Sequence, residues 1–527
     1  MAKQDTSNTD IQSVDALKEL ILHQEATISS LSSDVAYYRE AVEYLKKQLY
    51  GSKSEKTSAL VSMGQLNLFD EAEIEADERA SEPELIKVAG HTKKKFKGQR
   101  EELLASIPHT KVLVRHNEED MCCERCNTPL SVVGEVFVRT EVEFIPAQVK
   151  AIDYYRETCE CRKCRKNNQE YMSKAPMPYP VIQHSMASPS SVAWIMYQKY
   201  VNAMPLYRQE SDWVNMGIRL SRATMANWVI YASNNWLKPI YNLMHQNLRK
   251  EKWLHADETP IQVLKEEGRK NTTDSYMWVY STVNSSDRQI RLLEYQPGRG
   301  GKYPMKFLEG FQGYLHTDAY AGYNKLDGVK RCLCWAHLRR KFVEALPSKI
   351  KNKKSTLPYK GIEFCNELFK VEEECKTFTP AQRYEYRNQN TRPILNNFWS
   401  WVETQANDGV LMSTRFGDAI KYAINHKEEF MTYLEDGHCS ISNNLAENSI
   451  RGVCVGKKNY LFSASPEGAT ASGIVYSMVE TAKANKINPY KYLKYIFESI
   501  PGMAIEEYPE ILEEFLPWHP DVQQQCK

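Results

Sequence analysis

The chain has 527 residues, of which 42% are hydrophobic and 26% charged, and its formal net charge is +1. This composition is that of a soluble globular protein with roughly three or four domains of about 100–200 residues each. It excludes a membrane span, because no apolar run approaches about 20 residues, and the polar N-terminus does not resemble a signal peptide. With so small a net charge, any phosphate-bearing partner has to be bound by local basic patches.

Residues 14–49 carry the most regular periodicity in the chain. Apolar side chains recur at spacings of three and four, with β-branched residues in one set, leucines in the other, and Gln24 as a polar position. This heptad pattern favours a parallel two-stranded coiled coil, and therefore self-association. The alternative is an amphipathic helix that covers the protein's own core.

Residues 51–105 are expected to be a linker. The stretch 70–84 is acidic and poor in aromatic residues, so it has little surface to bury. It is followed by a basic run at 91–100. Such a run is either simply solvated or an arm that contacts phosphates, and the sequence leaves both interpretations open.

Two Cys-x-x-Cys pairs flank two segments, 132–144 and 148–155, that are rich in Val, Phe, Ile and Tyr and are predicted to be strands. Four thiolates carried on a hairpin form a closed tetrahedral site, which is typical of a structural zinc ribbon. Thirteen cysteines, an odd number, fit metal binding in a reducing compartment better than a secreted disulfide framework. The alternative is a set of reduced, unliganded thiols. The predicted zinc ligands are Cys123, Cys126, Cys161 and Cys164.

Residues 181–250 are predicted to be helical and to contain a helix-turn-helix. Ser188 and Pro189 form a helix start. Further on, a helix, a turn at Gly217 and a second helix capped by Ser221 follow one another. A helix pair of this kind binds DNA in many proteins and is also common in proteins that bind none. The second helix would present Arg222, Thr224 and Asn227 to a DNA duplex.

From about residue 252 the pattern becomes α/β. Three strands in succession, followed by alternating helices and strands, is the order of a ribonuclease-H-like mixed sheet. A charged and mostly helical insertion, 348–436, interrupts this core. Further helices are expected over 466–516, with a tail after Pro520. The predicted strands are 253–264, 275–282, 290–295, 314–317 and 331–334, and the predicted helices between and after them are 305–308 and 336–345.

Three carboxylates lie where such a core would bring them together. Asp257 and Asp318 belong near the ends of two strands that we expect to be neighbours, and Glu447 lies on a helix opened by Ser442, Asn443 and Asn444. Carboxylates suit Mg²⁺ or Mn²⁺. Two such ions, about 3.5–4 Å apart, are the standard device for in-line attack on a phosphodiester.

The same residues also have a local explanation. Asp257 and Glu258 would cap a turn before Pro260, and Asp318 would cap the helix that follows it. The chain has many acidic residues, so spacing alone does not decide between these interpretations.

Several blocks of the sequence favour the catalytic interpretation of these carboxylates, because together they resemble the signature blocks of bacterial DDE transposases of the insertion-sequence sixty-six family. The resemblance covers nearly the whole chain, including the N-terminal helix and the Cys-x-x-Cys module. Ser442 and Gly452 depart from the family pattern, and these departures concern local capping and helix termination only. The blocks are 255–260, 316–323, 334–342, 442–451 and 456–462, with 45–56 and 197–210 before them.

The resemblance implies a ribonuclease-H-like fold with two metal ions, Mg²⁺ or Mn²⁺, held by Asp257, Asp318 and Glu447. It implies cleavage and strand transfer at the ends of a mobile DNA element, so the expected partners are the element ends and target DNA. We also expect a dimer or larger homo-oligomer, possible need of small accessory proteins, and a cytoplasmic, nucleoid-associated location in a bacterium. The alternatives are a catalytically inactive DNA-binding derivative and a simple nuclease.

Basic residues near the triad are predicted to contact DNA. His337 follows the fifth strand and is either such a contact or a hydrogen-bonded core histidine. Cys332, Cys334 and His337 are not expected to bind metal, because they lie in a strand-to-helix block. Lys457 and Lys458 are placed about one turn past the Glu447 helix, and Arg451 is either a DNA contact or a partner of Glu447. The other predicted DNA contacts are Arg339 and Arg340, with Lys341 beside them.

These patterns predict the following domain order. The segments are a coiled-coil helix at 1–50, a linker with a basic run at 51–105, a zinc-ribbon-like domain at 106–180, a helix-turn-helix-like region at 181–250, a catalytic core at 251–347 and 438–485, a helical insertion at 348–437 and a C-terminal helical region at 486–527.

Overall fold

The computed structural model describes residues 110–113, 129, 135, 137, 147–161, 166–167, 172–346, 354, 356–407 and 414–527. The predicted coiled coil at 1–50 and the linker with its basic run at 51–105 lie outside these residues. The chain divides into two units, one of them residues 42–146, and the fold described below belongs to the other unit. No helix in the described ranges is long and apolar enough to cross a membrane.

A small hairpin lies where the zinc module is expected. Strand β1 (Thr158–Glu160) pairs antiparallel with β2 (Met172–Lys174). Cys161 directly follows β1, whereas Cys123, Cys126 and Cys164 lie outside the described residues. The predicted strand at 148–155 is wrong, because this segment is exposed and has no strand structure. Its apolar pattern suits a strand, but a strand also requires a partner for its backbone hydrogen bonds.

Helices α6 (Pro189–Tyr200), α7 (Leu206–Asn215), α8 (Arg222–Ala232) and α9 (Lys238–Leu248) follow. Ser188 caps α6 with a full capping box, as predicted. Gly217 turns the chain with a φ of +95°, a conformation that favours glycine. The Ser221 hydroxyl then accepts the Thr224 N–H and opens α8. The predicted order of helix, turn and helix is therefore confirmed.

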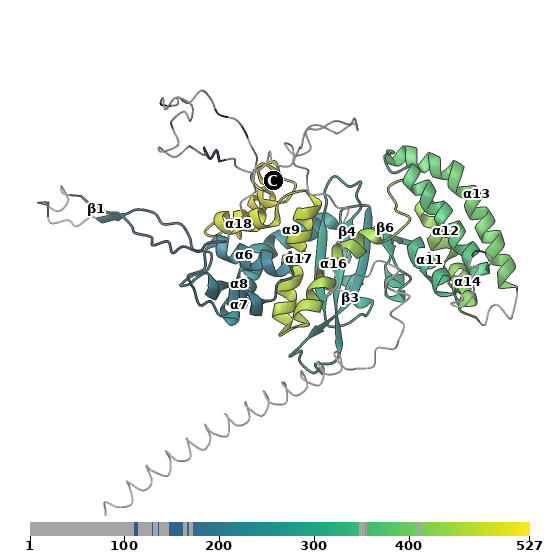
Figure 1. Ribbon diagram of the computed structural model, residues 1–527, viewed down its shortest axis with the longest axis horizontal. Coiled ribbons are helices and arrows are strands. Elements are labelled where there is room, and N and C mark those ends of the chain that lie inside the picture. The colour runs from purple at the N-terminus through teal and green to yellow at the C-terminus, as the bar shows by residue number, and fades with distance from the viewer. Residues whose placement is uncertain are drawn as a thin grey trace, which may run out of the picture. The chain divides into compact units, whose positions relative to one another are not determined.

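A mixed sheet with helices packed against it forms the core of this unit (Figure 1). Its strand order is β5-β4-β3-β6-β7, with β3, β4 and β5 antiparallel and β3, β6 and β7 parallel. Strand β3, the first strand of the predicted core, is thus central, and β6, the fourth, lies beside it, as predicted. A short strand, β8 (Phe462–Ser463), pairs with the far end of β3. The five strands are β3 (Trp253–Val263), β4 (Asp274–Thr282), β5 (Arg291–Gln296), β6 (Gly313–Thr317) and β7 (Val329–Leu333), with the short helix α10 (Lys302–Phe307) between β5 and β6.

Helix α17 (Pro466–Ala484) packs along β5 and satisfies backbone groups of this edge strand. The Ser477 hydroxyl accepts the Leu293 N–H at 2.7 Å, and the Thr481 hydroxyl accepts the Arg291 N–H at 3.0 Å. Gly473 permits the close approach, since a Cβ atom there would lie 3.1 Å from the Leu293 carbonyl oxygen. An exposed strand edge invites pairing with other chains, so these small polar residues protect the sheet.

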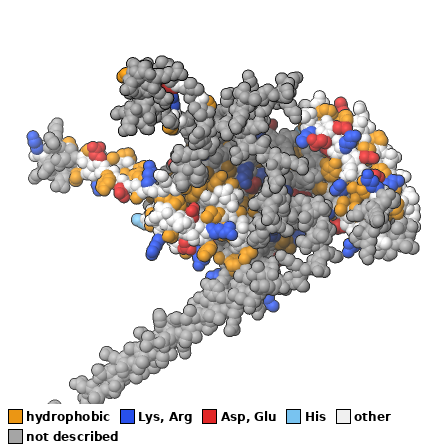
Figure 2. Space-filling model, in the orientation of Figure 1, with side chains coloured by type: hydrophobic (Ala, Val, Ile, Leu, Met, Phe, Trp, Pro, Cys, Tyr) orange, Lys and Arg blue, Asp and Glu red, His pale blue; other side chains and the backbone are white. Residues whose placement is uncertain are grey.

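The insertion is helical, as predicted, and has its own aromatic core. Trp335 at the start of α11 is fully buried and packs against Phe398 and Phe430 of the insertion. Figure 2 shows cationic and anionic side chains interspersed over this part of the surface. The helices are α11 (Trp335–Glu344), which precedes the insertion, and α12 (Leu357–Glu374), α13 (Pro380–Ala406), α14 (Arg415–Asn425) and α15 (Lys427–Met431) within it.

The chain ends in helices α18 (Pro489–Ser499) and α19 (Pro520–Gln525), with a 3-10 turn at Pro509–Phe515 between them. The predicted tail after Pro520 is wrong. Proline suits the first position of a helix, and the Cys526 carbonyl that follows α19 accepts the Asn488 N–H at 2.7 Å. The terminus is therefore bound to the body of the protein.

Glu294 on β5 predicts a pH-dependent stability. Its Oε2 atom is buried without a hydrogen-bond partner in the described residues, and burial raises the pKa of its carboxyl from 4.5 to about 7. Because the folded-state pKa lies above the ordinary value, ionisation costs stability from about pH 4.5 upward, and the full cost is reached above pH 7. Glu294→Gln should therefore stabilise the protein by about 2 kcal/mol at pH 8 and hardly at pH 4. Urea denaturation at both pH values checks this, and an equal gain at both would contradict it.

Candidate functional site

The three predicted carboxylates come from three elements that meet at the centre of the sheet. Asp257 lies in β3, and Asp318 directly follows β6. The parallel register pairs His255 with His316, so each aspartate lies two residues further along neighbouring strands. Glu447 is in the first turn of α16 (Asn444–Tyr460), which packs across β3 and β4. The sheet register and this helix crossing therefore bring the carboxylates into one region.

Asp257 has an unusual electrostatic environment. Its Oδ1 atom accepts the Glu258 N–H at 2.9 Å. The pKa of its carboxyl is raised from 3.8 to about 8, first by burial and then by the negative charges of Glu258, Asp318 and Glu447. Several acidic groups thus share one partly buried region, an arrangement that is stabilised by a bound cation.

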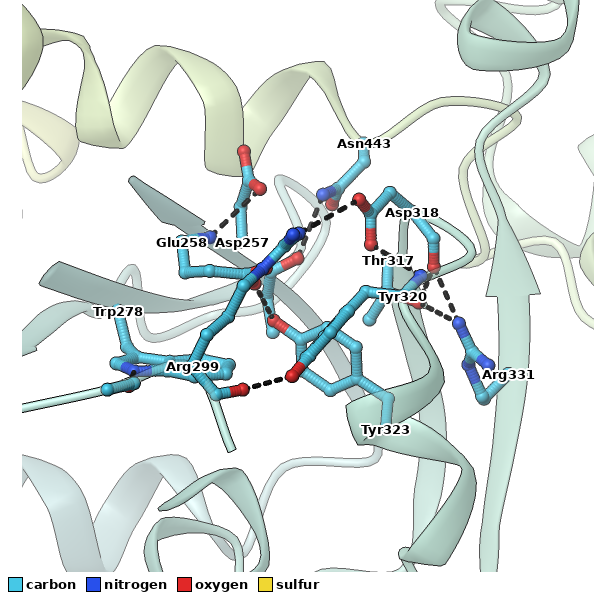
Figure 3. A network of polar contacts seen from close by, with 12 residues as sticks. Asp257, Glu258, Trp278, Arg299, Thr317, Asp318, Tyr320, Tyr323, Arg331 and Asn443 are labelled. Atoms are coloured by element: carbon cyan, nitrogen blue, oxygen red, sulfur yellow. Dashed lines mark hydrogen bonds and ion pairs between the residues drawn. The ribbon is translucent and has the colours of Figure 1, made fainter. Parts of the chain in front are cut away.

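Glu258 belongs to the site although the sequence suggested only a turn cap for it. The residue lies within β3, as the predicted strand at 253–264 implies, so the alternative of a turn before Pro260 is wrong. Arg299 contacts Glu258 Oε1 at 2.7 Å and lies 3.9 Å from Asp318 Oδ2, while the Tyr323 hydroxyl donates to Glu258 Oε2 at 2.7 Å (Figure 3). The Arg299 side chain therefore bridges two acidic groups of the site.

Arg299 is a second residue that sequence reasoning missed. Its guanidinium also lies over the Tyr320 ring, 4.1 Å from the centroid. The available signal was the isolated arginine among the glycines 298, 300 and 301 in the loop before α10. Only the fold connects that loop with the middle of β3 and the end of β6.

Asp318 also has the local role that the sequence allowed. Its Oδ1 atom accepts the Tyr320 N–H at 2.9 Å and so caps the turn. Its second oxygen, Oδ2, faces Arg299. On the neighbouring strand, Arg331 donates to the Asp318 carbonyl and to the Thr317 hydroxyl (Figure 3). Turn capping and a place in the acidic site are therefore compatible.

Asn443 does not cap α16 with its side chain, contrary to the prediction. Its side chain is buried and binds β3 instead: Nδ2 donates to the Ala256 carbonyl, and Oδ1 accepts the Nδ1–H of His255, both at 2.9 Å. The physical reason is burial against β3, where unpaired polar groups of the strand need partners. Asn443 thereby ties the start of α16 to His255 and Ala256, the two residues that precede Asp257 in β3.

A cavity of about 360 Å³ opens beside these carboxylates. It is lined on one side by Asp318, Arg299 and Tyr320 and on the other by His337, Arg340 and Lys341 of α11. Arg339, by contrast, does not line the cavity, and its Nε atom donates to Asn366 at 2.8 Å. Glu344 of α11 lines the cavity too. Basic side chains next to Asp318 suit a phosphate backbone whose reacting group lies near the acids.

His337 lies in the first turn of α11, with Nε2 3.8 Å from Glu447 Oε1. Burial lowers the pKa of its imidazole, and the negative charge of Glu447 acts in the opposite direction. Two groups of ligand atoms within 4.8 Å of one another occur in the described residues, Cys334–His337–Glu447 and His316–Cys332–Cys439. Asp257, Asp318 and Glu447 are near one another but do not form so close a group.

The other predicted DNA contacts lie outside the cavity lining. Lys457 and Lys458 are in the last turn of α16 rather than past its end, because the helix continues to Tyr460. Lys457 Nζ donates to the Pro260 carbonyl at 2.8 Å. Arg451 is exposed, and the ion pair recorded for Glu447 in the described ranges is with His337. On α8, Arg222 and Asn227 are exposed and Thr224 is half-buried.

The fold and this site define a class, a mixed α/β protein with clustered carboxylates beside a cavity that is lined largely by basic and aromatic side chains. A family model described as "Transposase IS66 family" matches residues 184–471. The chain belongs to this family of transposases, enzymes that cleave and transfer DNA. Further models match the IS66 C-terminal element at 477–518, the zinc-finger binding domain of transposase IS66 at 120–165, and "Transposase C of IS166 homeodomain" at 37–112.

Three similar proteins come from Sinorhizobium fredii and are named uncharacterized proteins y4hP, y4qI and y4jD. The first is 26% identical over 500 residues, covering 90% of this chain and 87% of its own length. The second is 25% identical over 544 residues, covering 96% and 97%, and the third is 24% identical over 507 residues, covering 93% and 96%. The similarity therefore extends along nearly the whole chain.

Proposed function

We propose that this protein is a DDE-type transposase with a ribonuclease-H-like core, in which Asp257, Asp318 and Glu447 are the catalytic carboxylates. The observation that carries the proposal is the convergence of the three carboxylates: Asp257 is half-buried in β3, Asp318 follows the neighbouring strand β6, and Glu447 lies on the helix that crosses β3. The pKa of Asp257 is raised by burial and by acidic neighbours that include the other two. A purely structural aspartate is more often placed so that its charge is stabilised.

The residues fit divalent metal ions. Glu447 Oε1 is buried and has no hydrogen-bond partner in the described part of the chain, and oxygen donors suit Mg²⁺ or Mn²⁺. Asp257, Asp318 and Glu447 would hold two such ions. When bound, these ions would activate an attacking hydroxyl and stabilise the leaving oxygen of a phosphodiester.

The remaining side chains would position DNA. Arg340 and Lys341, on the wall of the cavity, would hold the phosphates on either side of the scissile bond. The Lys457 ammonium is already tied to the β3 backbone, so it would contribute mainly charge. The further proposed contacts are Arg222, Thr224 and Asn227 on α8, Arg339 on α11, and Arg451 and Lys458 on α16.

Assembly through the N-terminal heptads into a dimer or larger oligomer is part of the same proposal, because joining two element ends requires more than one site. The domain boundaries predicted from the sequence and any use of accessory proteins also remain proposals. The alternative function is a DNA-binding protein that has lost catalysis.

Incubating the purified protein with Mg²⁺ or Mn²⁺ and a labelled duplex of the element end tests the proposal. We expect nicked strands and, with target DNA present, joined products resolved on a denaturing gel. Binding of the duplex without any strand cleavage in either metal would favour the catalytically inactive alternative.

The zinc module gives a separate prediction. The family match at 120–165 supports a structural zinc, and Cys123, Cys126, Cys161 and Cys164 are the proposed ligands. We expect about one zinc per chain by elemental analysis, lost in the double variant Cys123→Ser with Cys161→Ser. Cys526→Ser, at a buried cysteine of the C-terminal region, is the control and should keep the zinc. Full zinc content in the double variant would contradict the assignment.

A further inference from the structure

The imidazole of His337 lies at the candidate site without serving the fold. Its Nε2 atom is 3.8 Å from Glu447 Oε1, too far for a hydrogen bond. Its Nδ1 atom and Glu447 Oε1 are both buried without a hydrogen-bond partner in the ranges that the structure describes. A buried carboxylate oxygen without a partner, 3.8 Å from the Nε2 atom of an imidazole, points to a ligand that Oε1 and Nε2 both bind.

The other histidines beside the carboxylates differ from His337. His316 binds the Leu254 carbonyl through Nδ1 and the Ser440 N–H through Nε2, each at 2.8 Å. His255 binds Asn443 through Nδ1 at 2.9 Å, whereas its Nε2 atom is buried without a partner in the described residues but does not line the cavity. Both imidazole rings are fully buried. His316 binds backbone groups of β3 and of the segment before α16, and His255 binds the residue at the start of α16. His337 instead lines the cavity.

We propose that His337 is a direct ligand, through Nε2, of the divalent cation that Glu447 binds, and that this site consequently prefers Mn²⁺ to Mg²⁺. The inference rests on the proposed metal-dependent function. Two donors at about 2.1 Å from one ion are no more than about 4.2 Å apart, so the observed separation is within reach of a shared ion. Nitrogen donors suit first-row transition ions, whereas Mg²⁺ takes oxygen ligands.

Cys334, the third member of the close group, is not part of this proposal. Its Sγ atom is buried and accepts the Asn443 N–H at 3.1 Å, so it is committed to the start of α16. The position of His337 in a strand-to-helix block argued against metal binding. The contact with Glu447, which is 110 residues further along the chain, reverses that expectation.

The test uses Mn²⁺ bound to the full-length protein without DNA, read by electron spin-echo envelope modulation. We expect modulation from a directly bound ¹⁴N, which changes to that of ¹⁵N when the wild type carries ¹⁵N-labelled histidine. His337→Ala and His337→Gln should abolish the signal and weaken Mn²⁺ binding by about tenfold or more. Their affinity for Mg²⁺, measured by competition, should change less than about threefold. His438→Gln, at a histidine bound to Asp436 away from the cavity, should leave both unchanged.

The possible outcomes distinguish an error in the role of His337 from an error in the proposed function. Mn²⁺ binding that depends on Asp318 but carries no histidine nitrogen signal would overturn the role of His337 and leave the proposed function intact. Mn²⁺ binding that is insensitive to Asp318→Asn would contradict the proposed function itself. Labelling of the wild type shows whether a histidine binds the ion, independently of how well the variants fold, and the His337 variants then assign that nitrogen to His337.

Discussion

Replacing Asp318 by asparagine should lower the rate of DNA strand cleavage by about 10³-fold or more while leaving DNA binding within about twofold. The substitution removes a negative charge proposed to hold a metal ion, and metal ions supply several kcal/mol of transition-state stabilisation, each 1.36 kcal/mol being tenfold in rate. The fold should survive, because an asparagine oxygen can still accept the Tyr320 N–H that Asp318 Oδ1 accepts now. Single-turnover cleavage of a labelled element-end duplex measures the effect.

Asp327→Asn is the matched control for this substitution. Asp327 is exposed in the loop between β6 and β7 and does not line the cavity. The same loss of one negative charge there should leave cleavage within about twofold of the wild type. Normal cleavage by the Asp318 variant would remove this residue from the catalytic set.

Asn443→Ala should lower the free energy of unfolding by about 2–4 kcal/mol, because it leaves the buried Ala256 carbonyl and His255 Nδ1–H without their present partner. Cleavage should also fall, by about 10- to 100-fold at a temperature where the variant is folded, since Asn443 fixes the helix that carries Glu447. Urea denaturation gives the stability and a cleavage assay at 10–15 °C, roughly, gives the rate.

The neighbouring Asn444 provides the comparison. It is exposed and begins α16, so Asn444→Ala should change the unfolding free energy by less than about 0.5 kcal/mol. Equal destabilisation by the two variants would mean that the helix start matters in general and that the bonds of Asn443 to β3 do not.

Much of the fold was predictable from local patterns. Five strands of the sheet, the caps of α6 and α8 and the helical insertion were expected, since hydrophobic period and capping residues act over a few positions, whereas the short strand β8 was not. The predicted strand at 148–155 failed because apolar alternation reports side chains and says nothing of whether a partner strand exists. The missed helix α19 depends on Cys526 reaching Asn488, a contact between distant segments.

The residues of the candidate site were likewise predictable only in part. Asp257, Asp318 and Glu447 were identified from their sequence blocks, whose resemblance to one family extends over the chain. Glu258 and Arg299 were missed because they are 41 residues apart in sequence, so no local pattern indicates that they form an ion pair. Asn443 was recognised as a helix-start residue, yet the direction of its side chain depends on which strand α16 crosses.

The sequence by itself therefore determined the family, the order of strands and helices along the chain and the acidic residues that we propose are catalytic. Only the tertiary structure decided that Glu258 and Arg299 join them, that Asn443 anchors α16 to β3, and that His337 faces Glu447. The physical reason is that propensity, periodicity and capping are short-range properties of the chain. The electrostatics of the cavity arise from charges on separate elements, which burial and sheet register bring into one place.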